Sequence, residues 1–99
     1  MSVLIGAFEF EGPYEDVLHL KEEPGLYAIL CESKGEFELV ELDETNSLRN
    51  CFDSDEYTSN MRFWQENSHG KLLAAVHYTP ELTRQERFEM KNRLLLDFE

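Results

Sequence analysis

The chain has 99 residues, enough for a single domain over 1–99 and too few for two. Hydrophobic residues make up 41% and aromatic residues 12% of the chain, which argues against wholesale disorder in spite of 30% charged residues. Nine Lys and Arg against 21 Asp and Glu give a net charge of −12, which disfavours nucleic acid as a partner because it repels phosphate.

The cysteines and the hydropathy pattern favour a cytoplasmic protein. Cys31 and Cys51 cannot form a disulfide scaffold, and their spacing is not that of a zinc site. No apolar run approaches the roughly 20 residues that span a bilayer, and the first residues lack the basic start of a signal peptide. We therefore expect free thiols and no membrane association.

The first half of the chain predicts strands joined by a hairpin. Pro24 and Gly25 interrupt the chain just before its strongest strand signal, and the strand that follows the hairpin turn alternates apolar and polar residues. The elements predicted for this half are, in chain order, a short strand over 3–10, a short helix over 14–20, a strand over 26–31, a turn over 33–35 and a strand over 37–42.

The second half predicts three helices and one buried strand. The elements expected here are a short helix with Leu48 and Phe52 on its inward face, a helix with Tyr57, Met61 and Trp64 at helical spacing, a strand over 71–78 and a last helix that opens at Thr79-Pro80. The apolar residues of the last helix cover more than one side, so it should pack on two faces or on a partner; they are Leu82, Phe88, Met90, Leu94, Leu95 and Phe98. Together the elements predict an α/β sandwich around a small, mostly antiparallel sheet.

Two short motifs and their spacing resemble the GIY-YIG nuclease domain over almost the whole chain. Gly25-Leu26-Tyr27 stands for the first triplet of that family, and Glu41-Leu42-Asp43 falls where the second triplet should be. Residues 44–49 follow as the start of the first helix, and the strand that ends in 76–80 is similar to the third strand of small members. The resemblance implies a three-stranded, mostly antiparallel sheet flanked by helices.

The family cuts DNA by hydrolysis, with two tyrosines around the attacking water, an arginine for phosphate charge and a glutamate for one divalent metal. The resemblance places Tyr27 at the first tyrosine and Glu41 at the second. The arginine position falls on Cys51, with Arg49 two residues earlier, and Tyr57 is the candidate aromatic residue of the intervening helix. Phosphodiester cleavage needs metal and arginine together, because both offset developing negative charge.

The metal ligand of the family falls on the last helix near Lys91, with Glu89 and Glu86 as the nearest carboxylates. Arg84, Arg87 and Lys91 form a basic stripe on the same helix. This stripe could contact nucleic acid or phosphate, or it could pair with Glu81 and neighbouring acids.

Of the four principal groups, only the first tyrosine matches, so the resemblance implies a degenerate domain that is reused for binding. We expect a protein partner, attracted by the acidic surface, and no cofactor. One alternative is an endonuclease that uses Mg²⁺ or Mn²⁺ with Tyr27, Glu41, a carboxylate of the last helix and Arg49 or Arg87. Another is a structural domain that forms a homodimer through its apolar C-terminal helix. If the chain is not a nuclease, Tyr27 could be an ordinary strand tyrosine that packs on the sheet.

Overall fold

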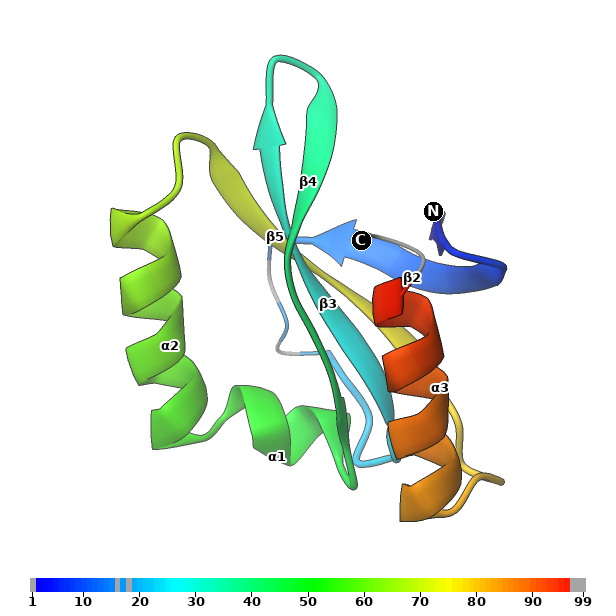
Figure 1. Ribbon diagram of the computed structural model, residues 1–99. Helices are drawn as coiled ribbons and strands as arrows, with labels where there is room; N and C mark the ends of the chain where they lie inside the picture. Colours follow the sequence, from blue (N-terminus) through cyan, green and yellow to red (C-terminus); the bar gives the residue numbers. More distant parts are fainter. Residues whose placement is uncertain (1, 16, 18, 97–99) are drawn as a thin grey trace.

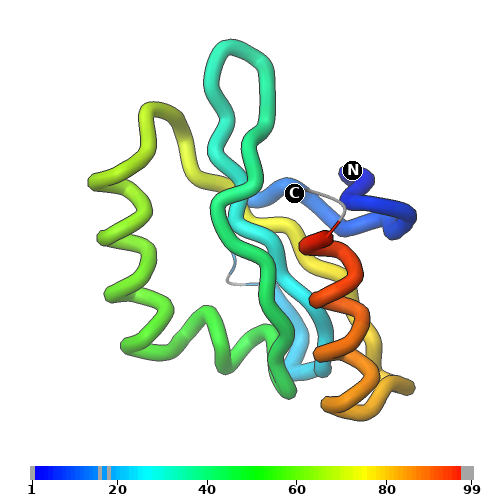
Figure 2. Tube along the Cα trace, in the orientation of Figure 1, coloured from blue at the N-terminus to red at the C-terminus, as the bar shows by residue number. Residues whose placement is uncertain are grey.

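The computed structural model describes residues 2–15, 17 and 19–96, and it is a mixed α+β fold (Figures 1 and 2). The strands are β1 (Ser2–Ile5), β2 (Phe8–Tyr14), β3 (Gly25–Ser33), β4 (Glu36–Thr45) and β5 (Lys71–Tyr78). The helices are α1 (Leu48–Phe52), α2 (Asp55–Glu66) and α3 (Arg84–Leu96). Within the described ranges, no helix has the length and apolar character needed to cross a bilayer.

The sheet has five strands in the order β1-β2-β5-β3-β4, and not the three predicted. All neighbouring strands are antiparallel. The opening segment is two strands, because the chain turns back after Ile5 and pairs β1 with β2. β2 in turn pairs with β5, with Glu11 opposite Val76. The middle of β5, residues 73–76, is buried, and the hairpin covers an edge of this strand that would otherwise be exposed.

The short helix predicted over 14–20 is wrong for the residues that the structure describes. Tyr14 ends β2 and does not begin a helix. Asp16 and Leu18 lie outside the described residues, and none of the other residues up to Leu20 is helical. The pairing of Tyr14 with Ala74 on β5 explains the difference, because it keeps this residue in the sheet.

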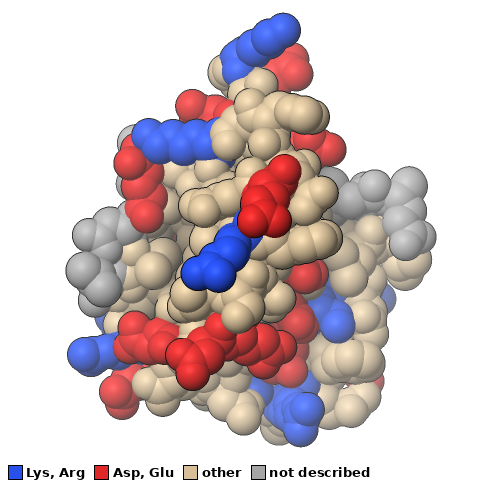
Figure 3. Space-filling view, turned by 90° about the vertical axis from the view of Figure 1, so that its left-hand side faces the viewer, with Lys and Arg blue, Asp and Glu red and all other residues tan. Residues whose placement is uncertain are grey.

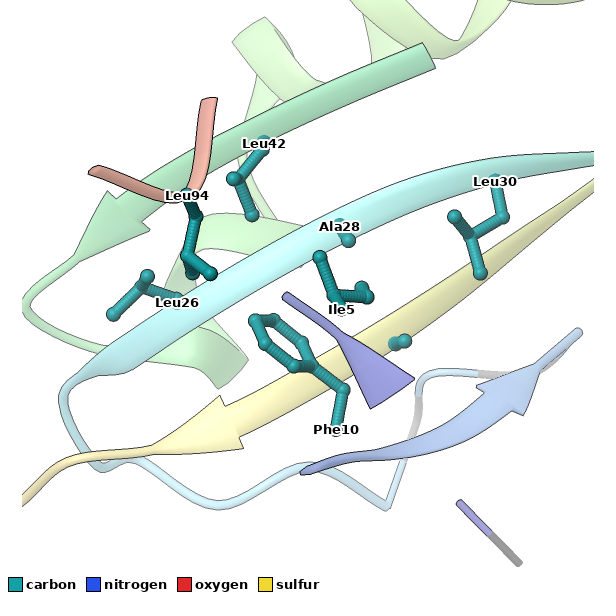
Figure 4. Packing of buried hydrophobic residues seen from close by; sticks show 8 residues of the cluster. Ile5, Phe10, Leu26, Ala28, Leu30, Leu42 and Leu94 are labelled. Atoms are coloured by element: carbon teal, nitrogen blue, oxygen red, sulfur yellow. The ribbon is translucent and has the colours of Figure 1, made fainter. Parts of the chain in front are cut away.

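The sheet separates two apolar cores. One face carries α3 and the curled β1–β2 hairpin, and the other carries α1 and α2 (Figure 1). The first core, shown in Figure 4, consists of Ile5, Phe10, Leu26, Ala28, Leu30, Leu42, Ala75 and Leu94. The second consists of Leu20, Ile29, Leu48, Phe52, Trp64, Ala74 and Val76. β3 supplies residues to both cores in alternation, as expected for a central strand.

A register shift interrupts the β3–β4 hairpin. Leu30 pairs with Leu39, but the preceding residue of β3, Ile29, pairs with Glu41. Val40 is therefore an extra residue on β4. Leu39 packs against the first core and Val40 against the second. The regular alternation predicted for this strand therefore stops at the bulge, which displaces every later residue of β4 by one position.

The last helix begins at Arg84 and not at Pro80, where the sequence predicted its start. The amide of Glu86 donates to Oγ1 of Thr83 at 3.2 Å, and the amide of Thr83 donates to the carboxylate of Glu86 at 2.9 Å. This reciprocal capping box fixes the first turn, so the residues between Pro80 and Thr83 form a turn instead. The predicted packing of Phe98 lies outside the described residues.

Replacing Gly25 with alanine should lower the free energy of unfolding by about 1–3 kcal/mol, the usual cost of overpacking. A Cβ at Gly25 would lie 2.4 Å from the carbonyl oxygen of His77 and 2.8 Å from Cδ1 of Leu48. The carbonyl belongs to the backbone of β5, so it cannot move without disturbing the β3–β5 pairing. Urea unfolding followed by circular dichroism measures the loss, and an unchanged unfolding midpoint would contradict it.

Candidate functional site

A cleft of about 310 Å³ lies on the α1–α2 side of the sheet, at the end of β4. Helix α2 borders it and stands apart from the β3–β4 hairpin (Figure 1). Two tyrosines contribute to its walls, so we call it the aromatic cleft. Its lining residues are Tyr27, Asp43, Glu44, Thr45, Cys51, Ser54, Glu56, Tyr57 and Asn60.

The bulge in β4 decides which side chain lies beside Tyr27. Asp43 is the residue directly opposite Tyr27 on the neighbouring strand. A regular hairpin that continued the pairing of Leu30 with Leu39 would place Leu42 there. Leu42 is instead buried in the first core. The extra residue therefore brings a carboxylate, and not a leucine, to the tyrosine.

Edge-to-face contacts hold the aromatic rings of the cleft in place. The ring of Phe52 lies 5.4 Å from that of Tyr27 and 4.5 Å from that of Tyr57, measured between centroids. Tyr57 in turn lies 6.2 Å from Trp64. The hydroxyl of Ser54 accepts the amide of Tyr57 at 3.1 Å and caps α2, which fixes the helix turn that carries this tyrosine. Both tyrosines are therefore positioned before any ligand binds.

The electrostatic environment keeps the cleft hydroxyl and thiol protonated. Burial raises the pKa of Tyr27 far above its usual value, and the charges of Asp43 and Glu41 raise it further. Burial also raises the pKa of the Cys51 thiol, while hydrogen bonds with Thr45 and Tyr27 partly offset this. A protonated thiol is a poor nucleophile, and a protonated tyrosine can donate a proton but cannot accept one.

Burial raises the pKa of Tyr57 to about 12, and this predicts a loss of stability in alkali. The folded state binds the tyrosine proton more tightly than the unfolded state, whose tyrosines titrate near 10. The stabilisation is therefore complete below pH 10 and decreases as the pH rises toward 12. Absorbance at the tyrosinate band should show a phase near pH 12 that Tyr57→Phe makes smaller. A titration unchanged by this substitution would contradict the assignment.

The structure brings together only part of the predicted catalytic set. Tyr27 and Tyr57 share the aromatic cleft, and Glu41 is near enough for its charge to raise the pKa of Tyr27. Arg49 is exposed on α1 and does not line the cleft. Glu89, the predicted metal ligand, lies on α3 at the opposite face of the sheet, where its carboxylate accepts a hydrogen bond from Gln85 at 3.1 Å. The sheet therefore lies between Glu89 and the two tyrosines, so these residues do not form one site.

The alternative metal ligand, Glu86, is also on α3, where it caps the helix. Hydrogen bonds from the backbone and side chain of Thr83 lower the pKa of this carboxyl. Among the described residues, no group of three or more His, Cys, Asp or Glu side chains is arranged to hold a metal ion.

The predicted basic stripe of α3 pairs with acids of β4. Arg87 is only 3% exposed and donates from Nε to Glu44 at 3.0 Å. Its other guanidinium nitrogens donate to the carbonyl of Leu82 and to the side chain of Asn46. Arg84 lies 3.9 Å from Glu44, and Lys91 lies 3.7 Å from Asp43. The acids in these pairs come from β4, and the predicted partner Glu81 is in none of them.

The face that carries α2 bears acidic and basic side chains, and the acidic ones gather along one part of it. Figure 3 shows acidic side chains in a row across the lower part of this face. The segment from α1 to α2 supplies the exposed carboxylates Asp53, Asp55 and Glu56, and Glu56 also lines the cleft. With this rim and two aromatic rings inside, the cleft is suited chemically to hold a cationic group.

Sequence reasoning missed Phe52 and Glu56 as parts of the site. Phe52 was predicted only as the inward residue of a short helix, yet it positions both tyrosines. Ser54 is a typical N-cap residue and could have indicated where α2 begins. A helix that begins there has Glu56 in its first turn. The resemblance to the GIY-YIG domain stays a prediction, because no family model, no curated protein and no solved structure matches this chain.

Proposed function

We propose that the chain is a degenerate GIY-YIG-like domain without nuclease activity, whose acidic face binds a basic segment of a partner protein. The order β3, β4, α1, α2, β5, α3 supports this, because it is the order that the resemblance implies. The β1–β2 hairpin is an addition at one edge of the sheet.

The observation that carries the proposal is the charge around the aromatic cleft. Asp43, Glu44 and Glu56 line it, and its lining includes no lysine or arginine among the described residues. Arg87, which the nuclease alternative would use for phosphate, is buried against Glu44. A phosphate therefore meets repulsion at this face, whereas a basic segment meets complementary charge.

Binding of model ligands tests the proposal. A short peptide rich in lysine and arginine should bind the full chain in calorimetry, and a DNA duplex should not. Binding should weaken strongly between 0.1 M and 1 M salt, since the screening length falls from about 10 Å to about 3 Å. A duplex that binds as well as the peptide, or a peptide that does not bind, would overturn the proposal.

Matched charge variants locate the binding face. Asp53→Asn combined with Glu56→Gln removes two carboxylates from the α1–α2 segment, and Glu36→Gln combined with Glu38→Gln removes two from the exposed start of β4. Both pairs change the net charge equally. Only the first pair should weaken peptide binding, and equal effects would show attraction to overall charge instead of to this face.

Cleavage assays separate the proposal from the nuclease alternative. Single-stranded, double-stranded and branched DNA, incubated with the protein and Mg²⁺ or Mn²⁺, should give no product above background. Product that disappears on Tyr27→Phe, or stabilisation by metal that disappears on Glu41→Gln or Glu89→Gln, would support the nuclease instead.

A further inference from the structure

We infer that the aromatic cleft receives the guanidinium group of an arginine side chain presented by the basic partner. The inference rests on the proposed function and narrows its acidic face to one anchoring site. Three features of the cleft carry it: its size, its aromatic walls and the carboxylates at its rim.

The cleft has room for one side chain and not for a folded element. Its volume of about 310 Å³ is at the lower end of the range for ligand pockets. An arginine that enters from a partner segment fits such a space with its planar head and at least part of its apolar stem.

The aromatic walls are rigid and partly accessible. Tyr27 and Tyr57 are half-buried and line the cleft, so part of each side chain is open to a ligand, while contacts with Phe52 fix both rings. A cation that stacks on such rings is attracted by their quadrupole. Because the rings are already ordered, little side-chain entropy is lost when the ligand binds.

The carboxylates at the rim are only partly used within the chain. Oδ1 of Asp43 accepts the amide of Glu44 at 2.8 Å and lies 3.7 Å from the ammonium group of Lys91. Both contacts use the same oxygen, so Oδ2 is the atom a ligand would reach. Glu56 is exposed at the first turn of α2 and also lines the cleft. Carboxylates from β4 and from α2 thus line the same cleft as the two tyrosines.

Arginine fits this arrangement better than lysine does. Its guanidinium is flat, so it can stack on a tyrosine ring while its N–H groups point outward at carboxylates. A lysine ammonium is a compact, strongly hydrated charge that cannot do both. Arginine is also enriched among the residues that dominate the energy of protein interfaces.

A peptide with one arginine among glycines and serines tests the inference by nuclear magnetic resonance of the full chain. We expect the amide signals of residues around Tyr27, Asp43 and Tyr57 to shift on titration. Replacing the arginine of the peptide with neutral citrulline should abolish the shifts, and lysine should give a weaker affinity. If the citrulline peptide bound with the same affinity as the arginine peptide, the inference would be overturned.

Variants of the protein assign the contacts. Tyr57→Leu should weaken peptide binding roughly three- to thirty-fold, as expected for the loss of a cation–π contact. Asp43→Asn should weaken it roughly tenfold, as expected for one charge-assisted hydrogen bond. The matched controls are Phe63→Leu on the exposed side of α2 and Glu38→Gln at the exposed start of β4, and both should bind nearly as the unsubstituted chain does.

The outcomes distinguish the arginine site from the broader proposal that the acidic face binds a basic segment. Circular dichroism first confirms that each variant is folded, and Tyr57→Phe, which keeps the ring, should restore binding if Tyr57→Leu loses it. If basic peptides bind but the cleft variants behave like their controls, the arginine site is wrong and the acidic binding face remains. If no basic peptide binds, both are wrong.

Discussion

Replacing Arg87 with methionine should lower the free energy of unfolding by about 3–5 kcal/mol, the usual cost of removing one partner from a buried ion pair. The Arg87 side chain is 4% exposed, and that of its partner Glu44 is 12% exposed. Methionine fills a similar volume but leaves the Glu44 carboxylate and the amide oxygen of Asn46 without their donor. This is a large share of the roughly 5–15 kcal/mol that stabilises a domain. Urea unfolding measures the loss.

Arg84 provides the matched control for this result. It lies on the same helix and approaches the same carboxylate, but its side chain is 82% exposed and its Nε is 3.9 Å from Glu44. Arg84→Met should therefore change the stability by less than about 1 kcal/mol. Similar losses for both variants would show that helix charge, and not the buried pair, attaches α3 to β4.

Replacing Phe10 with alanine should be comparably destabilising, by about 3–5 kcal/mol. Phe10 is fully buried in the first core, where it lies among residues of β1, β3 and β5 (Figure 4). The substitution removes most of an aromatic side chain from a position that its neighbours cannot refill. Thermal and urea unfolding should show the loss, with the milder Phe10→Leu retained for measurement if the alanine variant does not fold.

The control for Phe10 is an apolar residue of the same hairpin. Leu4 is 73% exposed, so Leu4→Ala should change the stability by less than about 0.5 kcal/mol. If Phe10→Ala were equally mild, the β1–β2 hairpin would be a peripheral addition and not a wall of the core.

Periodic segments of the sequence predicted their structure well. The strand over 71–78 has the predicted bounds, and Trp64 faces the sheet from α2 as its helical spacing with Tyr57 and Met61 requires. These patterns repeat over several turns or a whole strand, so a local exception does not obscure them. Cys31 is likewise buried in β3, as its place in an apolar strand indicated.

The errors of prediction come from local features that no periodicity records. The first ten residues alternate too weakly to reveal a turn, so the sequence predicts one strand where the structure has a hairpin. The three-stranded sheet is an implication of the resemblance and not of the strand pattern. The bulge at Val40 has no marker residue, yet it decides that Asp43 reaches Tyr27. Helical spacing put Arg84, Arg87 and Lys91 on one stripe, but only the packing of α3 on β4 determines that Arg87 is the buried one.

The position of β3 between two hydrogen-bonded neighbours has a consequence for how the molecule opens. β3 pairs along its length with β4 on one side and with β5 on the other, whereas β1 has β2 as its neighbour at the sheet edge. Amide protons in β3 therefore exchange with solvent only after the strand they pair with has separated, whereas those of β1 exchange after local fraying of the edge. Tyr27, which lines the cleft, lies on β3, so this wall of the site belongs to a part of the sheet that opens later than its β1 edge.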